Sequence, residues 1–153
     1  MKELFPMRNH SSYILKVSNL SVKFPNEIIL DNISFELKKA TTLAIIGPNG
    51  AGKTTLFRAF LNLVPYDGKI EWADKVKIGY VPQKLYVSDV PISVKEFLSF
   101  KNSSNIDHSL KLVGLGEKGM QDKRLGILSG GQLQRVLIAF AIIDEPNVLL
   151  FDE

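Results

Sequence analysis

Apolar and polar residues alternate along the first part of the chain, which is the pattern of half-buried β-strands. Residues 20–24 and 33–37 alternate in this way, and the turn-forming stretch Pro25–Glu27 separates them. The pattern therefore predicts two antiparallel strands that share one buried face. Two further strands are expected at residues 69–72 and 76–81.

Two other runs, Thr42–Ile46 and Val148–Phe151, are apolar almost throughout, which is typical of buried strands. We expect the second run to be covered on both faces in a parallel sheet, beside the strand formed by the first. A helical pattern follows the first run at residues 54–63, and Pro65 and the turn Asp67–Gly68 are expected to end it.

The pattern becomes helical after Pro82. Residues 93–96 have the S-x-x-E form of a capping box, and a second helix is expected at residues 105–113 with Gly114 as its stop. Ser129 then opens another helix. We interpret residues 84–128 as a mainly helical insertion within the fold.

Composition narrows the possible classes of protein. The 153 residues include 45% apolar residues and carry a net charge of +3 without a concentrated basic patch, which argues against a DNA-binding protein. There is no cysteine, and the histidines His10 and His108 have no ligand-like spacing. Residues 1–16 lack the apolar region of a signal peptide, and the run Val136–Ile143 is too short to span a bilayer, so we expect a soluble, cytoplasmic protein.

The segment Gly47–Thr54 matches the P-loop pattern G-x-x-x-x-G-K-S/T at every fixed position. Glycines let consecutive N–H groups converge on phosphate, Lys53 supplies a cation, and the Thr54 hydroxyl can bind Mg²⁺. A glycine-rich turn with a chance lysine is the alternative, and the expected strand and helix on either side make it improbable. The predicted ATP-binding residues are Gly47, Pro48, Asn49, Gly50, Ala51, Gly52, Lys53, Thr54 and Thr55.

The stretch Leu149–Glu153 has the form of a Walker B segment, in which a buried strand ends in two acids. Asp152 can hold Mg²⁺ directly or through water, and Glu153 can polarise an attacking water. The alternative is a strand that simply ends in two solvated acids.

A third element is Leu128-Ser129-Gly130-Gly131-Gln132. Ser129 is placed to cap a helix, and the two glycines leave the first N–H groups of that helix uncovered. The helix start is therefore a second candidate site for binding phosphate. An ordinary helix start after a flexible turn is the alternative.

The P-loop, L-S-G-G-Q and Walker B segments, in this order, resemble the ATP-binding subunits of ABC transporters from about Leu15 onwards. The resemblance implies an α/β fold: a P-loop NTPase (RecA-like) core with an N-terminal antiparallel β-subdomain and an inserted α-helical subdomain. By the same resemblance, we expect the C-terminal part of this core to be missing from the chain. It also implies one partial domain over residues 1–153: strands and P-loop core at 13–82, Q-loop, helical insertion and signature helix at 83–142, and the Walker B strand at 143–153.

Two further residues take roles from the resemblance. Gln83 follows Ile78–Pro82 as the family's Q-loop glutamine does, so the resemblance implies that Gln83 contacts Mg²⁺ and the attacking water. Glu153 is then the expected catalytic base. Phe24 falls where the family has an aromatic residue that stacks on adenine. It equally suits the alternating core of its strand, so both readings stay open.

The resemblance implies a homodimer in which the P-loop of one subunit and residues 128–132 of the other enclose ATP and Mg²⁺. It also implies membrane permease partners, and therefore a peripheral place on the cytoplasmic face of the membrane, with no nucleic acid as partner. Residues 76–86 and 91–98 are similar to the zinc, manganese and iron import branch, which adds a metal-binding extracytoplasmic protein as an indirect partner.

Three departures from the family pattern stand out. The turn Lys38–Thr41 lacks a glycine, so a different turn is expected, and Phe140 stands where the signature helix commonly carries arginine. The chain stops at Glu153, before the family's D-loop and switch histidine, so we interpret it as partial and expect an uncovered strand to make it poorly stable.

Two alternatives from other classes remain. A DNA-maintenance ATPase would carry a long coiled coil between the P-loop and the signature, and no sustained heptads occur there. A non-catalytic nucleotide-binding fragment would bind ATP without turnover.

Overall fold

The computed structural model describes residues 12–83, 91–101 and 103–152. The chain divides into two compact units, residues 1–75 and 76–153. Part of the sequence similarity to metal importers falls on residues 84–86, which lie outside the described residues.

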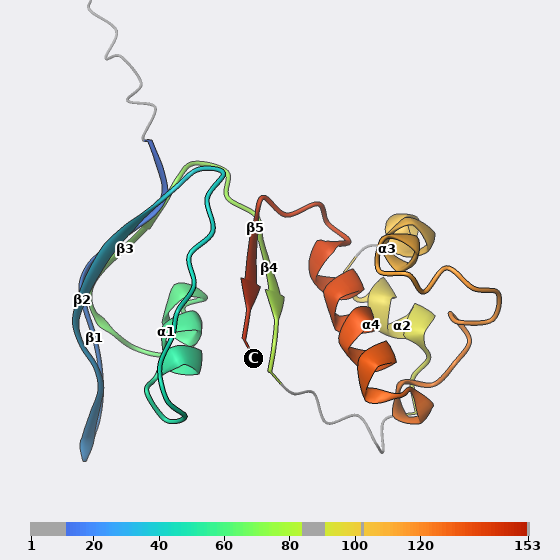
Figure 1. Ribbon diagram of the computed structural model, residues 1–153, viewed down its shortest axis with the longest axis horizontal. Coiled ribbons are helices and arrows are strands. Elements are labelled where there is room, and N and C mark those ends of the chain that lie inside the picture. Colours follow the sequence, from blue (N-terminus) through green and yellow to red (C-terminus); the bar gives the residue numbers. More distant parts are fainter. Residues whose placement is uncertain (1–11, 84–90, 102, 153) are drawn as a thin grey trace, which may run out of the picture. The chain divides into compact units, whose positions relative to one another are not determined.

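The first unit is a three-stranded antiparallel sheet with one helix on one face (Figure 1). Its strand order is β2-β1-β3, and the pairing of β1 with β2 confirms the two antiparallel strands predicted at residues 20–24 and 33–37. The elements are β1 Tyr13–Phe24, β2 Glu27–Lys38, α1 Lys53–Phe60 and β3 Asp67–Trp72.

Aromatic contacts attach α1 to this sheet. The Phe60 ring packs edge-on against Phe35 of β2 and Trp72 of β3, with ring centroids 6.1 and 6.2 Å apart. Buried aliphatic residues of β1 complete the apolar layer, so the helix that follows the P-loop has a fixed place on the sheet.

The prediction of a buried strand at residues 42–46 is wrong in this structure. These residues pair with no strand among those described, Leu43 is 45% exposed and Ile46 is 94% exposed. A run of apolar side chains favours burial, but a strand also needs backbone hydrogen-bond partners on a neighbouring strand. The described residues supply no such neighbour to this segment.

The expected turn at Asp67–Gly68 is also corrected, because these two residues begin β3. Gly68 has φ +95°, and a Cβ placed on it would lie 2.3 Å from the Asn19 carbonyl oxygen of β1. Glycine serves here to let two strands approach closely, which is a second use of the residue besides turn formation.

The turn that lacks the family's glycine has a left-handed residue in its place. Ala40 adopts φ +56°, a conformation that costs a non-glycine residue about 1 kcal/mol or more. The altered turn expected at Lys38–Thr41 is therefore present, with backbone strain at Ala40.

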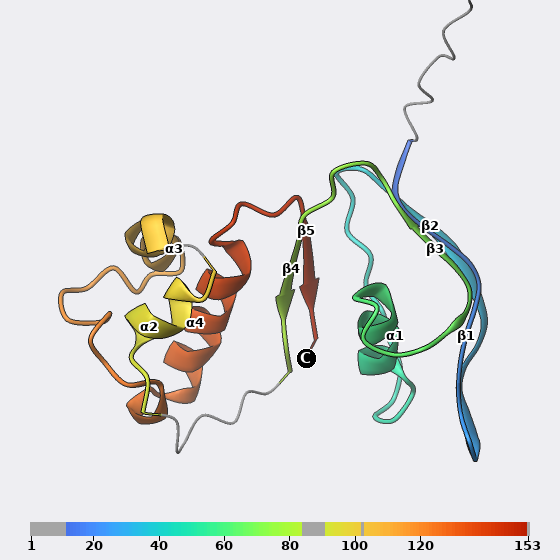
Figure 2. The same cartoon turned by 180° about the vertical axis from the view of Figure 1, so that it is seen from behind.

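The second unit consists of two parallel strands, a long helix and shorter helices beyond it, as both views show (Figure 1 and Figure 2). The helix α4 packs on β4, and α2 and α3 pack on α4. The elements are β4 Ile78–Val81, α2 Val94–Ser99, a 3₁₀ turn Ser103–Asn105, α3 Ile106–Leu112, a 3₁₀ turn Leu125–Ile127, α4 Gly130–Ile142 and β5 Val148–Phe151.

The helical insertion is present over its described part. Ser93 and Glu96 form the predicted capping box at the start of α2, and α3 ends just before Gly114, which has φ +70°. One apolar cluster holds these helices to α4, and its buried members are Val94, Leu98, Ile106, Leu110, Leu115, Met120, Leu125, Val136, Ala139 and Ile143.

The parallel pairing predicted for β5 is present in the second unit. β5 pairs in parallel with β4, and the expected neighbour, residues 42–46, belongs to the other unit, so its place beside β5 stays a prediction. Leu150 is 8% exposed, whereas Leu149 and Phe151 are 40% and 51% exposed. Side chains alternate between the two faces of a strand, and within this unit the face that carries Leu150 is the buried one.

Candidate functional site

The P-loop turns sharply before α1 through two left-handed glycines. Gly50 and Gly52 have φ +83° and +87°, and Gly52 is the N-cap of α1 without any side-chain cap. A Cβ on Gly52 would lie 2.8 Å from a Leu30 methyl group and 3.1 Å from the Ile29 carbonyl oxygen. Both backbone conformation and packing against β2 therefore require glycine at residue 52.

The backbone of the P-loop holds the Lys53 side chain against the loop. Its ammonium donates to the carbonyl oxygens of Gly47 at 2.8 Å and Pro48 at 2.9 Å. A cation next to a turn of backbone N–H groups, at the start of a helix, is the donor set that a triphosphate requires. The residues present at the P-loop therefore suit the phosphates of ATP.

The parallel pairing of β4 with β5 brings Gln83 and Asp152 to one edge of the strand pair. Val81 pairs with Phe151 at the carboxyl ends of the strands; Asp152 follows β5 directly, and Gln83 lies two residues after the end of β4. Asp152 is only 5% exposed, its N–H donates to the Val81 carbonyl oxygen at 3.0 Å, and the Tyr80 hydroxyl donates to its carboxylate at 3.1 Å. A buried, oriented carboxylate beside an exposed glutamine suits Mg²⁺, which prefers oxygen ligands.

Phe24 and Glu153 are two further predicted site residues. Phe24 is 45% exposed at the end of β1, so it does not belong to the core of its strand, and stacking on adenine stays a prediction. Glu153, the predicted catalytic base, lies outside the described residues.

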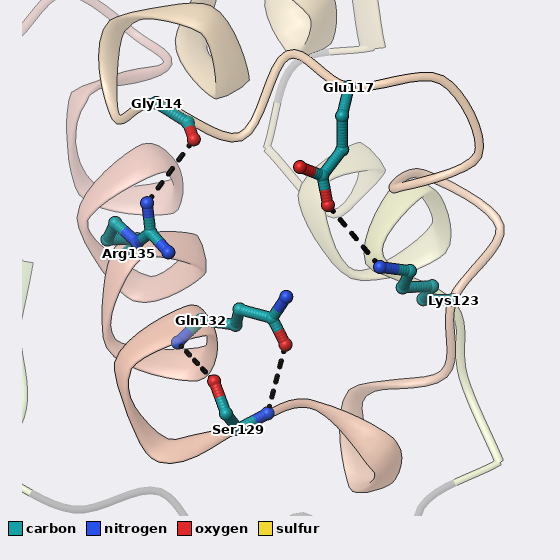
Figure 3. Close-up of polar contacts among 6 residues, drawn as sticks. All are labelled: Gly114, Glu117, Lys123, Ser129, Gln132 and Arg135. Atoms are coloured by element: carbon teal, nitrogen blue, oxygen red, sulfur yellow. Dashed lines mark hydrogen bonds and ion pairs between the residues drawn. The ribbon is translucent and has the colours of Figure 1, made fainter.

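The signature segment begins α4 with a reciprocal capping box (Figure 3). The Gln132 N–H donates to the Ser129 hydroxyl oxygen at 3.2 Å, and the Ser129 N–H donates to the Gln132 side-chain oxygen at 3.1 Å. The sequence predicted Ser129 as the cap. The second bond, in which the Gln132 side chain accepts from the Ser129 N–H, follows from the S-x-x-Q spacing and could have been predicted from it.

The capping box leaves three donors open at this helix start. Among the described residues, the N–H groups of Gly130 and Gly131 have no acceptor, and neither has the hydroxyl proton of Ser129. Ser129, Gly130 and Gly131 are exposed, and a Cβ on either glycine would meet no atom within 4 Å. This chain's own packing therefore does not require glycine at residues 130 and 131.

Arg135 was not singled out from the sequence, and it anchors the first turns of α4. Its guanidinium donates to the Gly131 carbonyl oxygen at 3.4 Å. It also donates to the Gly114 carbonyl oxygen at 3.3 Å, which ties the helix to the loop after α3 (Figure 3). The position of Arg135 four residues after Gly131 was a signal for the first bond. The contact with Gly114 depends on tertiary packing.

Comparison with known proteins decides the family. The model of the ABC transporter family matches residues 30–153. The chain belongs to the ABC transporter family. The structure also resembles CbiO1 from Clostridium perfringens, part of the ABC transporter complex CbiONQ, with a TM-score of 0.73 and 30% identity over 93% of this chain and 66% of that one.

Among curated ABC proteins, the chain is similar to zinc import ATP-binding proteins. It is 43% identical over 143 residues to ZnuC 2 of Aliivibrio fischeri and 41% identical over 144 residues to ZnuC of Rickettsia conorii. Each alignment covers 92% of this chain, but only 59% and 62% of the two relatives. The chain thus spans about 60% of their length. None of the helices in the described part of the chain is both long and apolar enough to cross a membrane.

Proposed function

We propose that this chain is the ATP-binding part of an ATPase subunit that powers a membrane transporter. The observation that carries the proposal is the presence of two phosphate-binding helix starts in one chain. The P-loop lysine is held against its own loop, whereas Ser129, Gly130 and Gly131 present donors that nothing in the described residues uses. Such donors suit the ATP of a second copy.

In this proposal the residues share the nucleotide between two copies. Gly47–Thr55 hold the phosphates, Phe24 stacks on adenine, and residues 128–132 close over the ATP of the partner copy. Thr54, Gln83 and Asp152 would hold Mg²⁺, which neutralises phosphate charge when it is bound. Glu153 would accept a proton from the attacking water.

The cargo is proposed from the relatives. Similarity to ZnuC proteins at 41–43% identity supports import of a metal ion such as zinc, through permease partners on the cytoplasmic face of the membrane. Uptake of radioactive zinc by cells that lack the gene, compared with cells that have it restored, tests this part. Equal uptake in the two strains would contradict a role in zinc import.

Lys53→Ala and Ser129→Ala separate the two halves of the nucleotide site. Lys53→Ala is expected to abolish ATP binding, because the phosphates lose their cation. Ser129→Ala is expected to retain ATP binding by the single chain and to lose ATP-dependent self-association. Fluorescent-ATP titration and sedimentation velocity with Mg²⁺ measure the two properties.

Turnover is tested in a chain extended to the length of the zinc import relatives. Glu153→Gln is expected to bind ATP, to stop hydrolysis and to accumulate the ATP-bound dimer. Hydrolysis at the parent rate would contradict the role of Glu153. An extended parent chain that binds ATP but never hydrolyses it would favour the non-catalytic alternative.

A further inference from the structure

Phe97, Lys101 and Phe140 form a cluster that joins the end of α2 to the last turn of α4. The rings of Phe97 and Phe140 are stacked, with centroids 4.6 Å apart and an interplanar angle of 27°. The Lys101 ammonium lies 4.7 Å from the centroid of the Phe140 ring. Phe97 also packs against both apolar clusters of this unit, so the stack continues the core.

Lys101 brings a positive charge to a helix end that has none of its own. The last turn of α4 carries no basic residue, although the carboxyl end of a helix favours a cation. Among the described residues, Lys101 forms no ion pair within 4.0 Å. Together with Asp144 and Glu145 it lines a hollow of about 500 Å³. The contact with the Phe140 ring therefore places this cation near the end of α4.

The beginning of α2 is attached to the segment that leads into the signature. The Val94 N–H donates to the Lys123 carbonyl oxygen at 2.9 Å, and the Leu125 N–H donates to the Ile92 carbonyl oxygen at 3.0 Å. Residues 125–127 form the 3₁₀ turn directly before Leu128. α2 is therefore joined to the segment before Ser129 by backbone bonds and to the last turn of α4 by the cluster at Phe140.

The length of α4 turns a small change at one end into a large displacement at the other. Phe140 lies about three helical turns after Ser129, which is about 16 Å along the axis. A tilt of about 10° about the Phe140 end would move Ser129 by about 3 Å, which is a whole hydrogen-bond length. Contacts at Phe140 can therefore decide whether Ser129 reaches a phosphate.

We propose that Phe97, Lys101 and Phe140 are positioning residues that set the tilt of α4 and thereby the placement of Ser129 on the ATP of a partner copy. This inference rests on the proposed function, because it needs a second copy to supply that ATP. None of the three residues touches the nucleotide in this proposal.

Lys101→Met removes the charge and keeps the aliphatic stem, and Lys101→Arg keeps a cation on the ring. In sedimentation velocity with ATP and Mg²⁺, we expect Lys101→Met to weaken self-association about threefold and Lys101→Arg to restore it. Phe140→Leu is expected to weaken it about tenfold, and Phe140→Tyr to restore it. Affinity of the single chain for fluorescent ATP should stay within about twofold of the parent in all four variants.

The outcomes separate this inference from the function on which it rests. Self-association of Lys101→Met and Phe140→Leu at the parent level overturns the positioning role alone. A loss of thermal stability without rescue by Lys101→Arg or Phe140→Tyr assigns the cluster to packing and also overturns it. If the parent chain binds ATP but never self-associates, the proposed function fails and the positioning role fails with it.

Discussion

The P-loop and the signature segment are two glycine-rich helix starts that are built in opposite ways. In the P-loop, Gly50 and Gly52 have positive φ, and Gly52 is packed against β2. In the signature, Gly130 and Gly131 form the first turn of α4 and have open space where a Cβ would lie. α1 has no side-chain cap, whereas Ser129 and Gln132 cap α4 with two bonds.

The difference teaches that glycine serves two needs in one site. In the P-loop the need is internal, because the backbone turn itself demands a residue without a side chain. In the signature the chain tolerates a side chain, so the need comes from whatever must approach the helix start closely. The two loops should therefore respond differently to the same substitution.

The largest effect is expected for Gly52→Ala. The left-handed backbone and the approach of Leu30 should lower the free energy of unfolding by about 2 kcal/mol and weaken ATP binding in parallel. Urea denaturation measures the first and fluorescent-ATP titration the second. Unchanged stability would show that the P-loop glycine is not required by the fold and would remove the contrast between the two loops.

Gly131→Ala is the matched change in the signature and should have the opposite effect on stability. An alanine in the first turn of α4 meets open space and should leave the free energy of unfolding equal or raise it by up to about 1 kcal/mol. ATP-dependent self-association should fall about tenfold, since a methyl group would stand between the helix start and phosphate. If Gly131→Ala is destabilised but self-associates normally, then the fold, and not an approaching phosphate, requires glycine at residue 131.

The smallest effect is expected at the capping box of α2, which has a glutamate where the capping box of α4 has a glutamine. α2 begins with Ser93 and Glu96 in the same reciprocal box, and the Ser93 N–H and hydroxyl lower the pKa of the Glu96 carboxyl below its usual value of 4.5. Because the folded-state pKa is depressed, this stabilisation is complete above about pH 4.5 and is lost as the pH falls through the lower value.

Glu96→Gln converts this box into the neutral form found at Ser129. We expect a small loss of stability at pH 7 that disappears as the pH falls through the lowered pKa of Glu96, measured as thermal midpoints of parent and variant from pH 3 to 8. A difference that is constant across this range would mean that the charge of Glu96 contributes nothing to the cap.

Much of the site could be predicted from local sequence. The spacing of glycines and Lys53, the S-x-x-Q and S-x-x-E boxes, and the alternation of β1 and β2 depend on residues near one another in the chain. Such patterns express backbone conformations and helix ends that local chemistry decides. A prediction failed where a distant partner was needed: residues 42–46 are not a strand.

The sequence by itself determined which groups can bind phosphate, where each helix begins and which strands alternate, because these properties follow from side-chain type and short-range spacing. Tertiary structure alone decided that Asp152 lies beneath the Tyr80 hydroxyl, that Arg135 reaches Gly114, and that Lys101 lies over the Phe140 ring. Each of these contacts joins residues far apart in the chain. Their distances depend on how strands and helices pack, and no local pattern encodes that packing.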